Sequence, residues 1–265
     1  MPKHKPKLGQ NFLVDDSARY RIADALGDIG HRIVLEIGPG KGAITEILAG
    51  RAGRLIAIEL DNELAPVLAA RYADREHIRV VHQDILETDL TSLIPAGEKA
   101  DVVGNLPYYI TSDILLHLFA ASGHLGRAVV MMQREVAERV AATPGNRDYG
   151  LLSATSQLYC RVENLFTLPP GAFSPPPEVY STVLRFTFAP RFHELGIDDA
   201  SAFDRFLKQS FAQKRKTLSN NLRSAGYEMQ QLTAAWPASI PPQTRAEALS
   251  LEQMAELYRA LLESI

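Results

Sequence analysis

The segment 105–108 reads Asn-Leu-Pro-Tyr, and its residue types could act on a planar amine. The side-chain oxygen of Asn105 and the backbone carbonyl of Leu106 can each accept one N–H hydrogen bond. Pro107 disfavours a helical conformation at the residue before it, so we expect the Leu106 carbonyl to point outward. The ring of Tyr108 can stack on a nucleobase, which contributes about 1–3 kcal/mol. This set suits reaction at the exocyclic amine of adenine, although such a short motif also occurs in simple turns.

A glycine-rich stretch, with Gly38, Gly40 and Gly42 spaced two residues apart, indicates a ligand site. Glycines at the turn between a strand and a helix let a ligand approach the backbone closely. Dinucleotide sites use the spacing Gly-x-Gly-x-x-Gly instead, and the acid Glu36 would repel a pyrophosphate. S-adenosylmethionine is cationic at sulfur and has no phosphate. We therefore favour a methyl donor over a nicotinamide cofactor.

Two acids stand where the next two strand-like runs end. Glu59 lies 21 residues after Gly38, a separation that suits capture of a ribose diol. Asp84 could accept a hydrogen bond from the amine of a cofactor adenine, with Ile85 packing on its ring. Asn105 ends the following run. Because the carboxyl ends of parallel strands meet at one edge of a sheet, we expect all of these residues in one crevice.

Short apolar runs alternate with helix-like stretches through the first half of the chain. The strand-like runs are Ile33–Ile37, Leu55–Glu59, Ile78–His82, Asp101–Gly104 and Ala128–Met132, and the helix-like stretches are Asp15–Leu26, Gly42–Leu48, Glu63–Tyr72, Ser112–Phe119 and Val136–Ala142. Such alternation predicts a parallel sheet covered by helices on both faces. Two later runs, 158–168 and 181–188, have only a proline-rich stretch between them and predict an antiparallel pair. The expected fold is thus a Rossmann-like α/β domain with a mostly parallel, seven-stranded sheet.

Beyond Pro190 the strand pattern disappears and apolar residues recur at helical spacing. We therefore divide the chain into a cofactor-binding domain, residues 1–189, and a small all-helical domain, residues 190–265. Residues 1–14 form a basic N-terminal segment within the first domain. Residues 201–225 carry six basic side chains and one acid, a local charge of +5, whereas the whole chain carries −3. These two basic regions are candidates for contact with nucleic acid, although a solvated helix face would look the same.

The composition excludes several classes of protein. Cys160 is the single cysteine, so the chain has no internal disulfide and no cysteine-based zinc site, and we expect no metal. The pattern around Cys160 predicts a buried structural thiol rather than a nucleophile. No apolar run approaches the length of a membrane span, and the N-terminus is unlike a signal peptide. We expect a cytoplasmic protein with no membrane contact.

Four motifs in order resemble those of the rRNA adenine N6,N6-dimethyltransferases. They are Gln10-Asn-Phe-Leu13, the glycine loop 36–42, Asn-Leu-Pro-Tyr at 105–108, and Phe173-Ser-Pro-Pro-Pro-Glu-Val-Tyr-Ser181. The match runs from about residue 7 to 188, and the basic helical tail is most similar to the bacterial small-subunit members. The resemblance implies a class I methyltransferase fold and S-adenosylmethionine as cofactor. It also implies that two adjacent adenosines in a hairpin near the 3′ end of 16S rRNA each receive two methyl groups.

The resemblance assigns roles residue by residue. Asn11 and Leu13 would contact the methionine end of the cofactor, and Gly38 would lie against its methionine and sugar. The roles expected above for Glu59, Asp84 and Ile85 agree with the family pattern. Asn105 would touch both cofactor and target, and Phe173 would cover the target base opposite Tyr108. The partner would be small-subunit rRNA or an immature 30S subunit, and we expect a monomer.

Three alternatives differ in class. An Erm-type enzyme would modify one adenosine of 23S rRNA with nearly the same motifs, but the tail favours the small-subunit enzyme. A DNA adenine methyltransferase is disfavoured, because its motif more often has Asp with two prolines and the chain has no obvious target-recognition domain. A non-catalytic RNA-binding assembly factor would keep the fold alone. The intact set of Glu59, Asp84 and Asn105 argues against that loss of catalysis.

Overall fold

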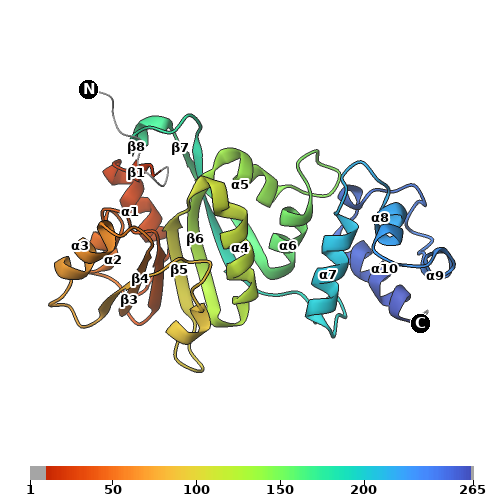
Figure 1. The fold of residues 1–265 in the computed structure, drawn as a ribbon, viewed down its shortest axis with the longest axis horizontal. Coiled ribbons are helices and arrows are strands. Elements are labelled where there is room, and N and C mark those ends of the chain that lie inside the picture. Colours follow the sequence, from red (N-terminus) through yellow and green to blue (C-terminus); the bar gives the residue numbers. More distant parts are fainter. Residues whose placement is uncertain (1–9, 264–265) are drawn as a thin grey trace. The chain divides into compact units, whose positions relative to one another are not determined.

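The computed structural model, which describes residues 10–263, contains a seven-stranded sheet (Figure 1). Its strand order is β4-β3-β2-β5-β6-β9-β7. The strands are β2 (Ile33–Ile37), β3 (Arg54–Glu59), β4 (Ile78–His82), β5 (Ala100–Asn105), β6 (Leu125–Gln133), β7 (Cys160–Leu168) and β9 (Ser181–Phe188). The basic residues Lys3–Lys7 lie outside the described part of the chain, so the structure does not test their predicted contact with RNA.

Five neighbouring strands run parallel, and β9 runs antiparallel to β6. The contacts Thr167–Thr182 and Glu163–Arg185 step in opposite directions along β7 and β9, so these two strands are also antiparallel. The predicted α/β fold, with an antiparallel pair at one edge of the sheet, is confirmed. The order places β2 in the centre, between β3 and β5, where the chain crosses over and a ligand crevice opens.

Helices connect the strands. They are α1 (Asp16–Ala25), α2 (Thr45–Leu48), α3 (Leu64–Arg71), α4 (Thr111–Ala120), α5 (Arg134–Ala141) and α6 (Leu151–Tyr159). The strand predicted over 158–168 is wrong in its first two residues, which end α6. Sequence reasoning missed α6 because its serines and threonine obscure the apolar spacing. Ser156 satisfies its hydroxyl on the carbonyl of Leu152, one helical turn back, and so enters the buried helix without penalty.

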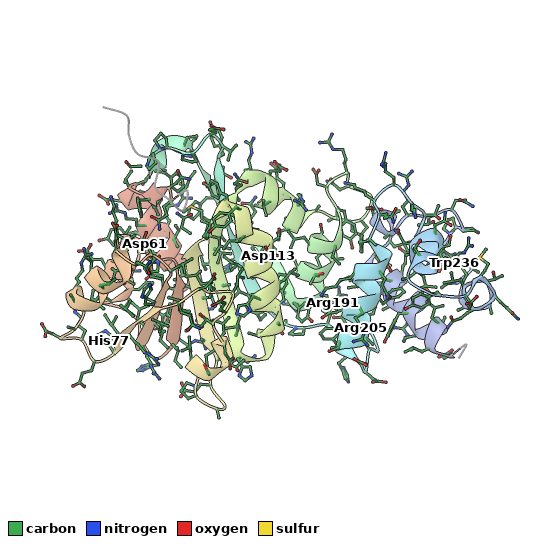
Figure 2. All side chains as sticks on the ribbon, viewed as in Figure 1. Asp61, His77, Asp113, Arg191, Arg205 and Trp236 are labelled. Atoms are coloured by element: carbon green, nitrogen blue, oxygen red, sulfur yellow. The ribbon has the colours of Figure 1, made fainter. Side chains whose placement is uncertain are left out.

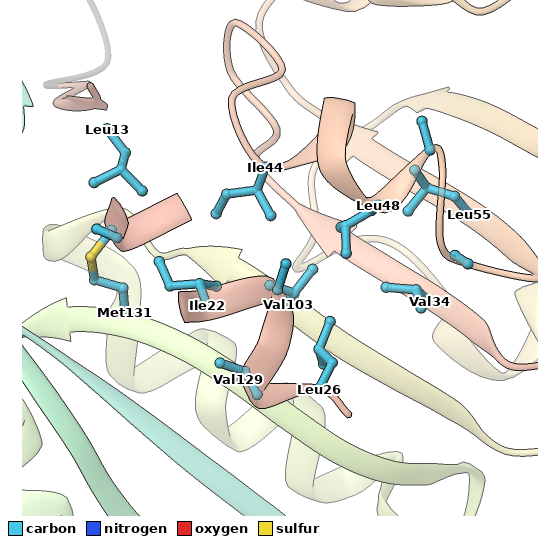
Figure 3. Close-up of a cluster of buried hydrophobic side chains, with 14 of the residues drawn as sticks. Leu13, Ile22, Leu26, Val34, Ile44, Leu48, Leu55, Val103, Val129 and Met131 are labelled. Carbon is cyan, nitrogen blue, oxygen red and sulfur yellow. The ribbon is translucent and has the colours of Figure 1, made fainter. Parts of the chain in front are cut away.

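The hydrophobic core covers both faces of the sheet. On one face, Ile22 of α1 and Leu48 of α2 belong to the same buried cluster as Val34 of β2 (Figure 3). On the other face, the ring of Phe119 from α4 lies 6.1 Å from that of Phe186 on β9. Burial of each such side chain contributes about 1.5–3 kcal/mol. The sheet between these layers is therefore a rigid base for the residues at its edge.

The chain divides into two compact units. One contains the described residues up to Ala137 together with Val162–Phe188, and the other contains Glu138–Arg161 together with the residues from Ala189 onward. Cys160, in the second unit, is buried as the sequence indicated, and burial raises the pKa of its thiol. No described helix is long and apolar enough to cross a membrane.

The second unit is helical after β9. Its later helices are α7 (Ala200–Ser210), α8 (Leu218–Ser224), α9 (Met229–Ala235) and α10 (Leu251–Glu263). The ring of Tyr258 on α10 lies 5.1 Å from that of Phe203 and 5.3 Å from that of Phe206, both on α7. Arg191, labelled in Figure 2, forms 2.6 Å ion pairs with Glu194 and Glu252. These contacts give the helical unit a core of its own.

Candidate active site

A cavity of about 360 Å³ opens at the carboxyl ends of β2, β3, β4 and β5. Its volume lies in the range of about 300–1,000 Å³ typical of small-molecule sites. Nine of the ten residues predicted from the sequence line it: Asn11, Leu13, Gly38, Glu59, Asp84, Ile85, Asn105, Leu106 and Tyr108. The fold thus brings together residues from four strand ends and the N-terminal segment, as the strand pattern predicted.

The N-terminal segment reaches the cavity as a short strand, β1 (Phe12–Leu13). It pairs antiparallel with β8 (Phe173–Ser174), which lies far along the chain. The carbonyl of Leu13 accepts hydrogen bonds from Arg19, at 3.3 Å to Nε and 3.0 Å to Nη2. These bonds hold the segment in place, so that Asn11 and Leu13 both face the cavity.

The glycine loop has the backbone that only glycine adopts readily. Gly38 and Gly40 have φ of +62° and +58°, in the left-handed region. A Cβ on Gly40 would also lie 3.1 Å from the ring of Phe12. Close packing against β1 therefore adds a second reason for glycine at position 40.

Glu59 is 3% exposed and is held at both carboxylate oxygens. Its Oε2 accepts from the backbone N–H of Gly40 and its Oε1 from that of Asp61, each at 2.9 Å. A carboxylate has about four acceptor sites, so two remain for a ligand. Glu59 thus links the glycine loop to the turn after β3 and can still accept from the two hydroxyls of a ribose.

Glu36 is also buried, at 2% exposure, but its Oε2 has no hydrogen-bond partner among the described residues. Burial raises the pKa of this carboxyl to about 7. An acidic oxygen that has no partner among the described residues suits a cationic ligand beside it better than a phosphate. This observation supports the fit of S-adenosylmethionine to the donor and acceptor groups present.

The turn after β4 presents Asp84 and Ile85. The Oδ1 of Asp84 accepts from the backbone N–H of Leu86 at 2.9 Å, which fixes the half-buried side chain. Ile85 is 7% exposed and adds an apolar surface to the cavity wall. One fixed acceptor beside one apolar side chain can hold the amine and the ring of an adenine.

Asn105, the last residue of β5, has a defined amide orientation. Its Nδ2 donates to the carbonyl oxygen of Asn11 at 2.9 Å, and no described residue donates to its Oδ1. The next carbonyl, of Leu106, likewise accepts no hydrogen bond from the described residues, whereas that of Pro107 accepts from Thr111 at 2.9 Å. Two unused acceptors therefore stand side by side at the cavity, as the motif predicted.

Tyr108 follows these acceptors and is partly buried. Its hydroxyl shares a 2.7 Å hydrogen bond with the hydroxyl of Ser181, which is fully buried. Burial raises the pKa of Tyr108, so the phenol stays neutral at physiological pH. The ring is held at its far end and lines the cavity with its apolar body.

Phe173 is the one predicted site residue that does not line the cavity. It is 3% exposed and belongs to the buried cluster of α1 and the sheet, while its neighbour Ser174 faces the cavity. Covering a target base would require this ring to leave the core. Its stacking role stays a prediction.

Several residues at the cavity had no predicted role. Lys41 lies over the ring of Phe12, with its Nζ 4.6 Å from the centroid, and Tyr109 is 65% exposed. Asp61, labelled in Figure 2, does not line the cavity; it lies in the turn before α3, where its Oδ1 accepts from the backbone N–H of Glu63 at 2.8 Å. Each of these residues is close in sequence to a predicted site residue, and this proximity was the one sign in the sequence of a place near the site. Within residues 10–263, no group of three or more His, Cys, Asp or Glu residues could hold a metal ion.

Comparison with known proteins gives a consistent result over nearly the whole chain. The family described as "Ribosomal RNA adenine dimethylase" matches residues 1–263. The chain is 62% identical to "Ribosomal RNA small subunit methyltransferase A" of Acidobacterium capsulatum, over 98% of this chain and 92% of that protein.

Two solved structures share the fold. A dimethyladenosine transferase from Plasmodium falciparum has a TM-score of 0.77 and 23% identity, over 96% of this chain and 98% of that one. The 23S rRNA methyltransferase ErmE has a TM-score of 0.69 and 26% identity, over 95% of this chain and 99% of that one. The sequence identity of this chain is thus much higher to the small-subunit methyltransferase, at 62%, than to ErmE, at 26%.

Proposed function

The chain belongs to the ribosomal RNA adenine dimethylase family, and from this premise we propose how its own residues carry out the reaction. It is an S-adenosylmethionine-dependent methyltransferase that acts on adenine N6 of ribosomal RNA. When bound, S-adenosylmethionine supplies an electrophilic methyl group. Gly38, Glu59, Asp84 and Ile85 would hold it together with Asn11 and Leu13.

The observation that carries the assignment of catalytic residues is the orientation of Asn105. Because Nδ2 is bound to Asn11, the free Oδ1 is available to accept one N6–H of the target adenine. The Leu106 carbonyl accepts the other N6–H. When both N–H groups of N6 donate hydrogen bonds on one side, the lone pair of N6 points to the other side, toward the methyl group. Holding the reacting atoms in line accounts for much of the rate that such a site provides.

Tyr108 supplies the stacking face for the target base, which must leave its helix or loop to enter the cavity. A neutral amide at position 105 accepts hydrogen bonds without adding a negative charge beside the sulfonium. The proton on N6 is lost after methyl transfer, when the nitrogen is cationic and acidic, so the reaction needs no general base. For a second methylation, Asn105 and Leu106 must manage with a single remaining N–H.

The substrate we propose is small-subunit rRNA, at two adjacent adenosines of a hairpin near its 3′ end. The 62% identity to a small-subunit methyltransferase supports this choice over the Erm-type alternative. The physiological substrate would be an immature 30S subunit. The enzyme would act on it as a monomer in the cytoplasm. Intact acceptors at 105 and 106 favour catalysis over a binding role alone.

The helical second unit would bind the RNA. Its basic side chains between 201 and 225 are all exposed: Arg205, Lys208, Lys214, Arg215, Lys216 and Arg223. The acid of this stretch, Asp204, accepts a 2.5 Å hydrogen bond from Tyr159. Exposed cations of this density bind phosphates, so affinity should fall steeply with salt. Each cation changed to Gln should reduce the salt slope by about one if it contacts a phosphate.

Transfer of labelled methyl groups tests the proposed function. Under-methylated small subunits, large subunits and duplex DNA are incubated in parallel with labelled S-adenosylmethionine, with Asn105→Ala as the control enzyme. We expect N6,N6-dimethyladenosine in the small subunit alone, lost in the variant. Label in the large subunit would instead assign the Erm-type activity, and no label in any substrate would leave a binding protein.

A further inference from the structure

Tyr180 lies at the sheet edge that bears the cavity and has no part in the reaction described above. The pairing of β6 with β9 ends at Gln133 and Ser181, and one more hydrogen bond continues it. The backbone N–H of Arg134 donates to the carbonyl of Tyr180 at 2.9 Å. Tyr180 therefore lies beside the carboxyl end of β6, and β6 in turn neighbours β5, which ends in Asn105.

The side chain of Tyr180 is exposed and backed by a cation. It is 46% exposed, so part of the ring is open to a ligand. The guanidinium carbon of Arg134 lies 5.2 Å from the centroid of this ring, within the range of a cation–π contact. The ring thus has a fixed position, a cationic neighbour and open area beside them.

A short covalent and hydrogen-bonded path joins this ring to the target site. Ser181, the next residue, shares its hydroxyl with Tyr108 at 2.7 Å. The two tyrosines are thus linked through one serine. Because RNA is a continuous polymer, a nucleotide that adjoins a target base bound on Tyr108 can run along the sheet edge where Tyr180 stands.

We propose that Tyr180, backed by Arg134, is a second stacking platform that takes the base of a nucleotide adjoining the target adenosine. The inference rests on the proposed function and adds a determinant of RNA binding outside the cofactor cavity. The aromatic face binds any base by stacking, and the guanidinium holds the ring through its cation–π contact. A platform of this kind would hold one adenosine while its neighbour occupies the cavity, which suits a substrate with two adjacent targets.

The test pairs variants of the protein with variants of the RNA. The probe is a labelled hairpin RNA whose loop carries two adjacent adenosines, and a series of hairpins in which one loop nucleotide at a time is abasic. Dissociation constants are measured with S-adenosylhomocysteine present, for the wild type, Tyr180→Ala, Tyr180→Phe and Val179→Ala. Val179 is a matched control, because it is an exposed apolar neighbour, at 42%, without an aromatic face.

Tyr180→Ala should weaken binding of the intact hairpin by about 5-fold to 150-fold, the range for loss of one stacked base. Tyr180→Phe and Val179→Ala should stay within about twofold, because the first keeps the ring and the second never had one. When the abasic position is the one beside the target, the affinity of the wild type should fall by the same factor. The affinity of Tyr180→Ala should not fall further.

Two results would overturn the platform alone. One is an unchanged affinity of Tyr180→Ala, and the other is an equal loss on every abasic hairpin, which would indicate a general effect on folding or charge. If the wild type still transfers methyl groups to small subunits, either result would overturn the stacking platform and leave the proposed function intact. If the wild type neither methylates small subunits nor binds the hairpin, both proposals are wrong.

Discussion

Asp101 and Glu36 lie on the neighbouring strands β5 and β2, toward opposite edges of the sheet, and both are almost fully buried. Asp101 is fully paired: Arg32 donates to its two oxygens at 3.1 and 3.0 Å, and the backbone N–H of Arg127 donates at 2.9 Å. The Oε2 of Glu36 has no hydrogen-bond partner in the described part of the chain, and burial raises the pKa of this carboxyl.

The difference separates the part of the sheet that maintains the fold from the part that receives ligands. A buried acid whose oxygens are all hydrogen-bonded within the protein helps to hold the fold. One with a free oxygen can still bind a ligand. Glu36, Asn105 and Leu106 each have an acceptor that no residue between 10 and 263 uses, and all lie at the carboxyl edge. The comparison predicts that changes at the two edges will affect different properties.

Asn105→Ala should give the largest effect, and it should fall on catalysis. The change removes one acceptor for the target amine and the bond to Asn11, so kcat should fall about 10²–10³-fold, as when one polarising group of an active site is removed. The unfolding free energy should change by less than about 2 kcal/mol. Single-turnover methyl transfer and urea unfolding measure the two quantities, and a kcat within tenfold of the wild type would contradict the assigned role.

Asp101→Ala should have the opposite profile. It removes the carboxylate partner of Arg32 and Arg127 and should lower the unfolding free energy by about 3 kcal/mol. The loss should not be larger, because both arginines can still reach solvent. Affinity for S-adenosylmethionine, measured by calorimetry on the folded variant, should be unchanged. Asp113→Ala is the control, since this exposed acid on α4 (Figure 2) should cost less than about 1 kcal/mol.

Glu36→Gln should change how stability depends on pH. The folded pKa of Glu36 is about 7 and its ordinary value is 4.5, so between these values the folded state binds the extra proton. Raising the pH therefore destabilises the wild type relative to the variant. The difference in unfolding free energy should grow from near zero at pH 4.5 to about 3 kcal/mol at pH 8.

Urea unfolding across this pH range, with and without S-adenosylmethionine, checks the Glu36 prediction. A cationic ligand favours the ionised carboxyl, so the difference between wild type and variant should shrink when the ligand is saturating. A difference that does not vary with pH would show that Glu36 does not titrate in this range.

Gly40→Ala should lower the unfolding free energy by about 1–2 kcal/mol, because alanine is strained in the left-handed backbone of this position. It should also weaken cofactor binding, because the new methyl group meets Phe12 and displaces β1. Gly97 is the matched control: its φ is +83° and a Cβ there meets nothing within 4 Å. Gly97→Ala should cost similar stability and leave cofactor affinity unchanged, so equal affinities of the two variants would contradict the role of β1.

The sequence predicted much of the fold and most of the cavity, and the reason is local. Apolar runs ending in Glu59 and Asn105 mark strand ends, and parallel strand ends must meet at one edge. The orientation of the Asn105 amide was out of reach, because it depends on a carbonyl 94 residues away. The burial of Phe173 was also missed, since a phenylalanine in a proline-rich segment gives no sign of which way its ring points.

The pairing of β1 with β8 also sets when the site can form during synthesis. Phe12 leaves the ribosome early, but its partner Ser174 follows only after most of the sheet has been made. Until then Asn11 has no strand to hold it beside Asn105, and the amide that receives the target base is not oriented. The site of an enzyme that acts on ribosomal RNA thus cannot be complete until residue 174 has been translated.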